Sequence, residues 1–328
     1  MDMGDNTYKI SVIVPVYNVA QHVEKCAHSL FSQTMEEGVE FIFVDDASPD
    51  DSIARIKTVL QLFPNRINHC QFIKHSHNRG LTAARNTGLL HSKGEFIIHT
   101  DSDDWMEVDM LKRMYDCAMQ EDSDLVYCDF VFRYSNCSVP YQCPPWTADR
   151  VSSLKSFIRS DWTVIWNILA KRKLYEKYGL KSLESISFYE DFNLSSKLFL
   201  VASKVSYVNI PLHNYNQTNV NSIMHKFSSK YMTDEINGCL DAISFYTQLS
   251  QIKPFEDVLS YRLLKAKKGM LLKSSEVSKY SSIYPDCHKY IFTCTYYNRK
   301  LKFMAWCATH GLLCIDYFVI FLRRIFKR

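Results

Sequence analysis

The chain has 328 residues, of which 47% are hydrophobic and 14% aromatic, and its formal net charge is +4. This length suits one large domain with an appendage, and the small net charge disfavours a protein built as a whole for nucleic acid. The first residues are polar and do not resemble a signal peptide. The 11 cysteines are an odd number without CxxC spacing, so we expect reduced, packed thiols in a cytoplasmic protein.

The first half of the chain alternates predicted strands and helices. Apolar runs predict buried strands at residues 10–16, 41–44, 70–74 and 124–130. Helical spacing of apolar residues predicts helices over residues 20–33, 81–91 and 108–119. This alternation is typical of an α/β fold with a mostly parallel sheet, right-handed crossovers and flanking helices.

Residues 95–105 form the most informative stretch. They begin as an apolar run that predicts a buried strand and end in the carboxylates Asp101, Asp103 and Asp104. Asp101 and Asp103 alternate with Ser102 and would point to one side of an extended backbone. Adjacent carboxylates repel unless a cation lies between them, which indicates Mg²⁺ or Mn²⁺. The alternative is an acidic turn that caps a helix starting near residue 105.

A second predicted strand also ends in carboxylates, Asp45 and Asp46. Open α/β sheets bind ligands at the carboxyl ends of their strands, so neighbouring strands would place both acidic pairs in one crevice. The first pair would then accept hydrogen bonds from a ribose or base, and the second would hold metal and diphosphate. The sequence contains neither GxGxxG nor a P-loop motif, which disfavours dinucleotide dehydrogenases and P-loop NTPases.

Four blocks, at residues 12–18, 44–48, 78–88 and 101–105, resemble the family 2 glycosyltransferases in order and spacing. The resemblance covers roughly residues 8–225. It implies a Rossmann-like GT-A catalytic domain over residues 1–225, with a nucleotide-sugar half at about 8–130 and an acceptor half at about 131–225. A helical C-terminal region over residues 226–328 would follow. The family implies inverting transfer of a sugar from a nucleoside diphosphate, usually UDP, with Mg²⁺ or Mn²⁺.

The resemblance also implies roles for the residues that match the family's motifs. Those implied to bind the nucleotide, ribose, sugar or diphosphate are Pro15, Tyr17, Asn18, Asp45, Asp46, Asn78, Arg85, Asp101 and Ser102. Asp103 is implied to bind the metal, with Asp101 as a second ligand. A simple turn residue at Asn18 and a helix surface charge at Arg85 are the structural alternatives.

In the second half, residues 188–192 resemble the Glu-Asp pair that heads a helix in the family. Inverting transfer needs a carboxylate that accepts the proton of the acceptor hydroxyl. The resemblance implies Asp191 as this base, with Glu190 supporting it or contacting the acceptor. As a plain sequence feature, such a pair complements the dipole of the helix.

Two further segments resemble the family on the acceptor side. Residues 162–172 resemble its tryptophan-asparagine segment, in which dense aromatic residues stack on a sugar or pack beneath the acceptor loop. Residues 212–224 resemble the segment after its last sheet strand. There Tyr215 or His213 contacts the departing diphosphate, or His213 packs in the core.

The C-terminal region is predicted to be helical over residues 231–249, 255–272 and 302–328. The charged residues 265–268 most simply predict a solvent-exposed helix face, with a membrane-facing one as the alternative. In the tail, Lys302, Thr309, Asp316 and Arg323 recur every seven residues as a polar stripe beside a wide apolar arc. Such an arc needs a cover, either the catalytic domain or a lipid surface. The basic end favours anionic headgroups, and the acidic residue disfavours a spanning helix, so we expect peripheral contact with the inner face of the membrane.

Together these features predict a metal-assisted hexosyltransferase that serves polysaccharide biosynthesis. Its substrates would be a UDP-sugar and a hydroxyl of a glycan or lipid-linked saccharide, with no nucleic acid partner. One alternative is a nucleotidyltransferase, which would usually show a glycine- and arginine-rich loop after the first strand. The other is a catalytically silent partner that binds sugar nucleotides or lipid.

Overall fold

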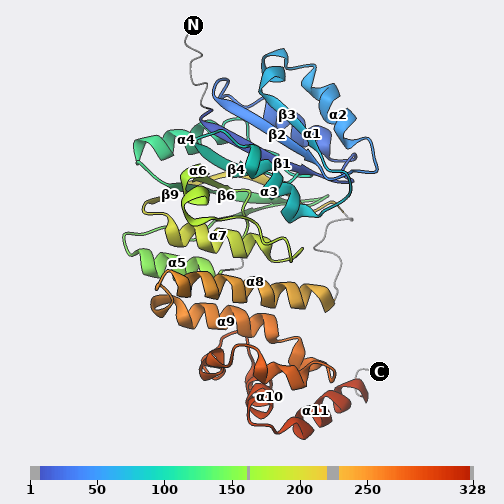
Figure 1. Ribbon diagram of the computed structural model, residues 1–328, viewed down its shortest axis with the longest axis vertical. Coiled ribbons are helices and arrows are strands. Elements are labelled where there is room, and N and C mark those ends of the chain that lie inside the picture. Colours follow the sequence, from blue (N-terminus) through green and yellow to red (C-terminus); the bar gives the residue numbers. More distant parts are fainter. Residues whose placement is uncertain (1–7, 161–162, 220–228, 326–328) are drawn as a thin grey trace.

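The computed structural model describes residues 8–160, 163–219 and 229–325. Figure 1 shows a sheet with flanking helices, followed by a stack of helices that leads to the C-terminus. The strands are β1 Ile10–Val16, β2 Val39–Asp45, β3 Cys70–Lys74, β4 Phe96–His99, β5 Trp105–Met106, β6 Leu125–Arg133, β7 Ser138–Tyr141, β8 Ile168–Lys171 and β9 Val205–Asn216.

The helices divide between the sheet and the C-terminal stack. Those of the sheet domain are α1 Val23–Phe31, α2 Ser52–Leu60, α3 Leu81–His91, α4 Met110–Gln120, α5 Arg150–Arg159, α6 Arg172–Tyr178 and α7 Glu190–Val201. The stack contains α8 Ser229–Gln248, α9 Glu256–Lys267, α10 Arg299–Thr309 and α11 Leu313–Ile325. Short 3-10 helices lie at Pro64–His69, Lys253–Phe255, Met270–Leu272, Val277–Ser282 and Pro285–Tyr290.

Within the described residues, nine strands form one sheet in the order β3-β2-β1-β4-β8-β6-β9-β5, with β7 beside β6. The first four strands of this order are parallel, as predicted for the nucleotide half. The acceptor half is mixed, because β8 runs antiparallel to both β4 and β6. This half lacks the regular strand–helix alternation that a parallel sheet requires.

The register brings the two acidic strand ends together. Both β2 and β4 pair with β1, with Val16 opposite Asp45 and Ile13 opposite His99. The carboxylates that follow these strands therefore lie at one edge of the sheet, on two strands that are separated only by β1.

The sheet is covered on both faces by apolar side chains. One core contains Val12 and Val14 of β1 with residues of α1 and α4, and the other contains Ile13 with residues of α6 and α7. On that second face, α3 lies very close to β1, since a Cβ at Gly88 would be 2.4 Å from Ile13 Cγ2. Only glycine permits this approach, which fixes the helix that carries Arg85.

The tail differs from the single amphipathic helix that its pattern predicts. It forms α10 and α11, which are separated by a turn where Gly311 has φ 75°. The prediction of a solvent-facing polar stripe is wrong, because Asp316 is fully buried. The prediction that residues 265–268 form a solvated face is also wrong for Lys267, which is fully buried. Among the described residues, no helix is both long and apolar enough to cross a bilayer. Residues 221–224 of the family-like segment and residues 326–328 of the predicted tail helix lie outside the described ranges.

All eleven cysteines lie within the described residues and are free thiols, most of them buried. This agrees with the expectation of packed thiols rather than disulfides. Burial raises the pKa of Cys26, Cys128 and Cys239, so these thiols are held in their neutral form and act as small apolar core residues.

Candidate active site

The loops after β1 and β2 form the first part of the site. Asn18 and Ala47 both have left-handed backbones, with φ of 53° and 54°, and the Asn18 N–H donates to Ser48 Oγ at 2.9 Å. Pro15 is buried within β1, whereas the Tyr17 side chain is 46% exposed. The two loops therefore support each other and leave an aromatic side chain accessible at the sheet edge.

Asp46 organises the next loop. Its Oδ1 accepts hydrogen bonds from His75 Nδ1 at 2.6 Å and from the Arg79 N–H at 2.8 Å, and its Oδ2 accepts one from the Gly80 N–H at 2.8 Å. These bonds fix the loop that carries the exposed Asn78. The neighbouring Asp45 accepts from the backbone N–H of residue 48 at 2.7 Å.

Sequence reasoning missed His75, although a usable signal was present. His75 directly follows β3, so its side chain emerges at the same carboxyl edge as Asp45 and Asp46. Its Nε2 contacts Thr87 Oγ1 of α3 at 2.9 Å. His75 therefore ties the end of β2 to α3.

Arg85 joins the two halves of the site. Its guanidinium donates to Asp101 Oδ1 at 2.8 Å, to Asp191 Oδ1 at 2.5 Å and to Glu190 Oε1 at 3.3 Å. Arg85 is 1% exposed, so the surface-charge alternative is wrong. Burial alone would lower its pKa, but the three carboxylates hold the pKa above the ordinary range. Arg85 is therefore a permanent cation between three acids.

The two acids at the start of α7 differ in their distance from Arg85. Burial raises the pKa of both Glu190 and Asp191, and the charge of Asp191 raises that of Glu190 further. Arg85 opposes both shifts and lies closer to Asp191. Arg85 therefore stabilises the charged form of Asp191 more strongly than that of Glu190. The Asp191 side chain is 20% exposed, so it remains accessible to an acceptor.

The acidic turn after β4 does not cap a helix. It leads into β5, and α4 begins later with Asp109 at its N-cap, so the helix-cap alternative is wrong. Asp103 Oδ2 accepts from Asn219 Nδ2 at 2.8 Å. Burial raises the pKa of Asp103, and the charge of Asp101 adds to this shift. Ser102 is buried between these two acids.

Asp104 has a structural position. It is fully buried, and it accepts hydrogen bonds from the Asn216 N–H at 2.8 Å and from His213 Nε2 at 3.1 Å. The His213 ring stacks on Trp166 with 4.1 Å between ring centroids. The alternative of a packed His213 is therefore confirmed, and Asp104 fastens the acidic turn to β9.

A cavity of about 230 Å³ lies beside Asp103. The residues that line it are Gln21, His22, Glu24, Lys25, Asp103, Trp105 and Asn216. Lys25 Nζ lies 3.0 Å from the centroid of the Trp105 ring. Two basic side chains thus share a cavity with the predicted metal ligand. Sequence reasoning missed His22 and Lys25, because nothing in their local pattern links them to the acidic turn.

The residues at this turn fit a divalent metal that substrate helps to hold. No group of three or more His, Cys, Asp or Glu side chains with metal-site geometry occurs in the described part of the chain. Mg²⁺ usually keeps several waters and binds one or two carboxylates together with substrate phosphates. Asp103 offers such a hard oxygen ligand, whereas the Asp101 carboxylate is bound to Arg85.

Comparisons with known proteins identify the family to which this fold and sequence belong. The family model described as Glycosyl transferase family 2 matches residues 11–178. The uncharacterized glycosyltransferase EpsJ of Bacillus subtilis (strain 168) is 31% identical over 278 residues, which cover 81% of this chain and 78% of the relative. The cholesterol galactosyltransferase of Borreliella burgdorferi is 28% identical over 327 residues, which cover 86% and 87%.

A solved structure shares the fold over nearly the whole chain. The crystal structure of S. aureus TarS 1–349 in complex with UDP-GlcNAc superposes with a TM-score of 0.71, at 16% identity and over 92% of both chains. The GT-A fold predicted from the sequence is thus confirmed, together with its helical C-terminal extension. From the family match and its relatives, the chain belongs to the family 2 glycosyltransferases.

Proposed function

We propose that this glycosyltransferase is an inverting enzyme that moves a sugar from a UDP-sugar to a hydroxyl of a glycan or lipid-linked saccharide. The observation that carries the proposal is the contact of Arg85 with Asp101 on one side and Asp191 on the other. In this proposal, Asp101 is the donor-side carboxylate and Asp191 is the base, and one guanidinium contacts both. The TarS structure contains UDP-GlcNAc, which supports a UDP donor.

The donor would lie across the carboxyl ends of β1, β2 and β4. Tyr17, Asn18, Asp45 and Asn78 are the side chains for the base and ribose, with Pro15 shaping the first loop. Asp46 acts chiefly through the loop that it orders. The diphosphate would lie in the cavity beside Asp103, where Lys25 supplies positive charge and the His22 ring lines the wall.

In the proposed reaction, the Asp191 carboxylate acts as the general base. The acceptor oxygen attacks the anomeric carbon while its proton moves to the Asp191 carboxylate. The bond from that carbon to the diphosphate breaks, and the leaving oxygen keeps the electron pair. Attack from the face opposite the leaving group inverts the anomeric centre. Arg85 donates to Asp191 and favours its ionised form, while Glu190 beside it would contact the acceptor hydroxyl.

Mg²⁺ or Mn²⁺ bound by Asp103 would supply positive charge against the leaving diphosphate. Asp101 stays a predicted second ligand, with its carboxylate shared with Arg85 in this structure.

A panel of sugar nucleotides and acceptors tests this proposal. We expect one UDP-sugar to give acceptor-dependent UDP release that stops in excess EDTA and returns with Mg²⁺ or Mn²⁺. The product should carry the opposite anomeric configuration, which NMR detects. Failure of every donor to release a nucleoside diphosphate would favour the catalytically silent alternative. The family match already argues against a nucleotidyltransferase.

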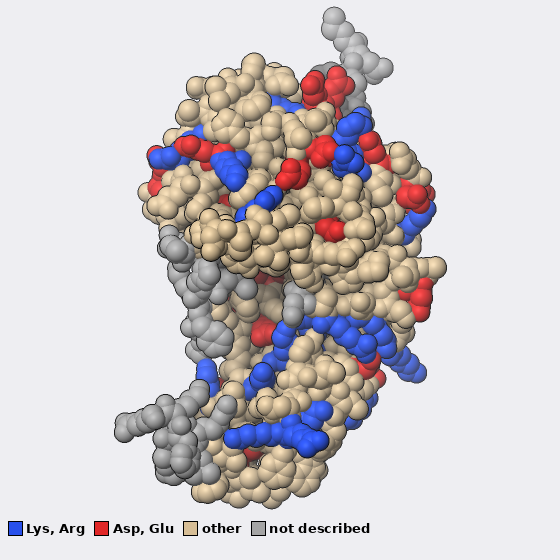
Figure 2. Space-filling view, turned by 180° about the vertical axis from the view of Figure 1, so that it is seen from behind, with Lys and Arg blue, Asp and Glu red and all other residues tan. Residues whose placement is uncertain are grey.

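The C-terminal region supports a peripheral position at the inner face of the membrane. Residues 226–328 contain 17 Lys and Arg against 8 Asp and Glu, a formal net charge of +9, whereas residues 1–225 contain 22 against 27, a net charge of −5. Figure 2 shows Lys and Arg side chains gathered over this lower part of the molecule. Phe303 and Phe318 are exposed in the same region. Exposed aromatics within a basic region suit an anionic lipid surface.

Flotation with anionic vesicles should separate this region from the rest of the surface. We expect Lys300→Glu to lower vesicle binding about tenfold, since each surface cation contributes about 1 kcal/mol and the substitution reverses the charge. The separate pair Phe303→Ser and Phe318→Ser should lower binding by a similar factor, because it removes apolar surface that would enter the lipid interface. Substituting Leu62 and Leu90, which are exposed on the nucleotide half, by Ser is the matched control and should change nothing. Equal loss in both pairs would contradict a membrane-facing C-terminal region.

A further inference from the structure

The residue before the catalytic helix has an unusual backbone. Tyr189 is the N-cap of α7 and has φ 71°, in the left-handed region. A bulky residue keeps this conformation only where its surroundings impose it. Because Glu190 and Asp191 follow immediately, the conformation of Tyr189 sets the direction in which both acids leave the turn. Because this conformation favours glycine and the chain has a tyrosine here, we expect its cause to lie in tertiary contacts.

Arg262 of α9 holds Tyr189 in place. Its Nη1 donates to the Tyr189 hydroxyl at 3.0 Å, while its other nitrogens donate to the carbonyl oxygens of Ile158 and Ser160 at the end of α5. The guanidinium carbon lies 5.1 Å from the centroid of the Phe192 ring. Arg262 is almost fully buried. One rigid, fork-shaped cation therefore links α5, α9 and the first turn of α7.

Helix α8 holds the same turn from another side. The backbone N–H and the hydroxyl of Ser187 donate to Asp234 Oδ2 at 2.9 and 3.1 Å. The Phe188 ring stacks on Tyr231 with 5.0 Å between centroids. Every residue from 187 to 189 thus has a side-chain partner on α8 or α9.

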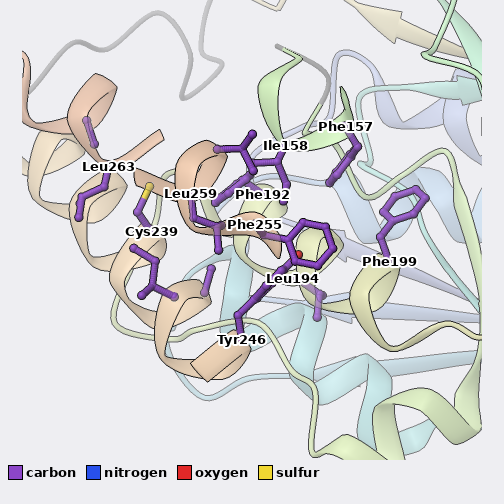
Figure 3. Packing of buried hydrophobic residues seen from close by; sticks show 14 of the residues in the cluster. Phe157, Ile158, Phe192, Leu194, Phe199, Cys239, Tyr246, Phe255, Leu259 and Leu263 are labelled. Atoms are coloured by element: carbon purple, nitrogen blue, oxygen red, sulfur yellow. The ribbon is translucent and has the colours of Figure 1, made fainter. Parts of the chain in front are cut away.

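The apolar packing beneath this turn is continuous with the C-terminal helices. Figure 3 shows Phe192 and Leu194 of α7 among Cys239 and Tyr246 of α8 and Leu259 of α9. These side chains are buried together. Movement of α8 or α9 would therefore be transmitted to the first turn of α7, because a close-packed core leaves no free space.

We infer that Arg262 is a positioning residue for the base: it holds Tyr189 in the left-handed conformation and so sets the place of Asp191 beside Arg85. This inference rests on the proposed role of Asp191. Residues 189 and 262 both lie beyond residues 11–178, which the family model matches. Through Arg262, α9 would thus support the active site from outside the matched region.

The chain offers a matched control on the same helix. Lys267 is also a buried cation of α9, but its ammonium contacts the Ile283 carbonyl oxygen at 2.7 Å and His288 Nε2 at 3.1 Å, away from the turn. Arg262→Met and Lys267→Met each remove one buried cation from α9, so both test for a general loss of stability. Tyr189→Phe removes only the hydroxyl that accepts from Arg262.

We expect Arg262→Met and Tyr189→Phe to lower kcat about 10- to 100-fold, because small misplacements of a catalytic group have effects of this size. KM for the donor should stay within about twofold in both variants, since ground-state donor binding does not involve the turn. Lys267→Met should keep the kcat of the wild type in its folded fraction. Arg262→Lys should restore part of the rate, because its ammonium can still reach one of the three acceptors.

Hydrogen exchange at residues 186–193 provides a readout that does not depend on activity. We expect these amides to exchange at least about tenfold faster in Arg262→Met than in Lys267→Met, as local opening is measured in this way. If the amides of Arg262→Met kept wild-type protection, the positioning role of Arg262 would be wrong. The proposed function would not be affected, because Asp191→Asn tests it separately. A loosened turn with unchanged turnover would overturn Asp191 as the base, and the inference with it.

Discussion

Asp191→Asn should lower kcat by roughly 10²–10⁴-fold, the usual contribution of a positioned general base. The amide keeps the shape of the side chain and cannot accept the proton. Donor binding should hardly change, because the proposed base faces the acceptor and not the donor. Steady-state kinetics with UDP release, together with calorimetric titration of the UDP-sugar, measures both quantities. A collapse of donor binding with a high residual rate would instead indicate a structural role.

Glu190→Gln is the matched comparison for this variant. If Glu190 already carries a proton, glutamine imitates its charge state, and the loss should stay within about tenfold, as for one hydrogen bond. Equal losses in Glu190→Gln and Asp191→Asn would show that the charge is not confined to Asp191.

The pH profile of the wild-type enzyme has a definite sign. Asp191 must be ionised to act, and burial raises its pKa. Activity should therefore fall as the pH decreases through this raised pKa, and the acid limb should lie above that expected for an ordinary aspartate.

The regular part of the nucleotide half was predictable from sequence. The strands at 10–16 and 70–74 and the helix at 81–91 have the predicted bounds, since each is an unbroken apolar or helical pattern between turn residues. The predicted helix at 20–33 is shorter, Val23–Phe31, because residues 19–22 form a turn that supports the loop after β1. Residues 105–106, taken as the start of a helix in one alternative, instead pair with β9.

The contacts that build the site could not be predicted in the same way. Arg85 meets acids that lie 16 residues away at Asp101 and 106 residues away at Asp191, and no local pattern encodes such distances. The hydrogen bond that holds Tyr189 comes from Arg262, which lies 73 residues further along the chain. Likewise, the buried Lys267 reads as solvated from sequence, because only the tertiary fold covers it.

Asp103→Ala should abolish detectable transfer and leave the fold intact. If Asp103 holds the metal as proposed, loss of its carboxylate removes several kcal/mol of transition-state charge stabilisation. Asp103 is also less costly to replace than Asp104, because Asp104 fastens the acidic turn to β9 through Asn216 and His213. Thermal unfolding of Asp103→Ala should therefore stay close to that of the wild type, because the substitution removes a half-buried carboxylate with a hydrogen bond from Asn219.

Metal binding itself provides the second measurement for this variant. In the presence of UDP, Mn²⁺ titration followed by electron paramagnetic resonance should show one bound ion in the wild type and at least about 100-fold weaker binding in Asp103→Ala, the upper range for changes at a metal site. Asp116→Ala, which removes an exposed carboxylate on α4 that pairs with Lys112, should bind Mn²⁺ as the wild type does. Unchanged Mn²⁺ affinity in Asp103→Ala, or full activity of the wild type in excess EDTA, would show that the diphosphate is neutralised by the protein's own cations. His22 and Lys25, which share the cavity with Asp103, would then be the first residues to replace.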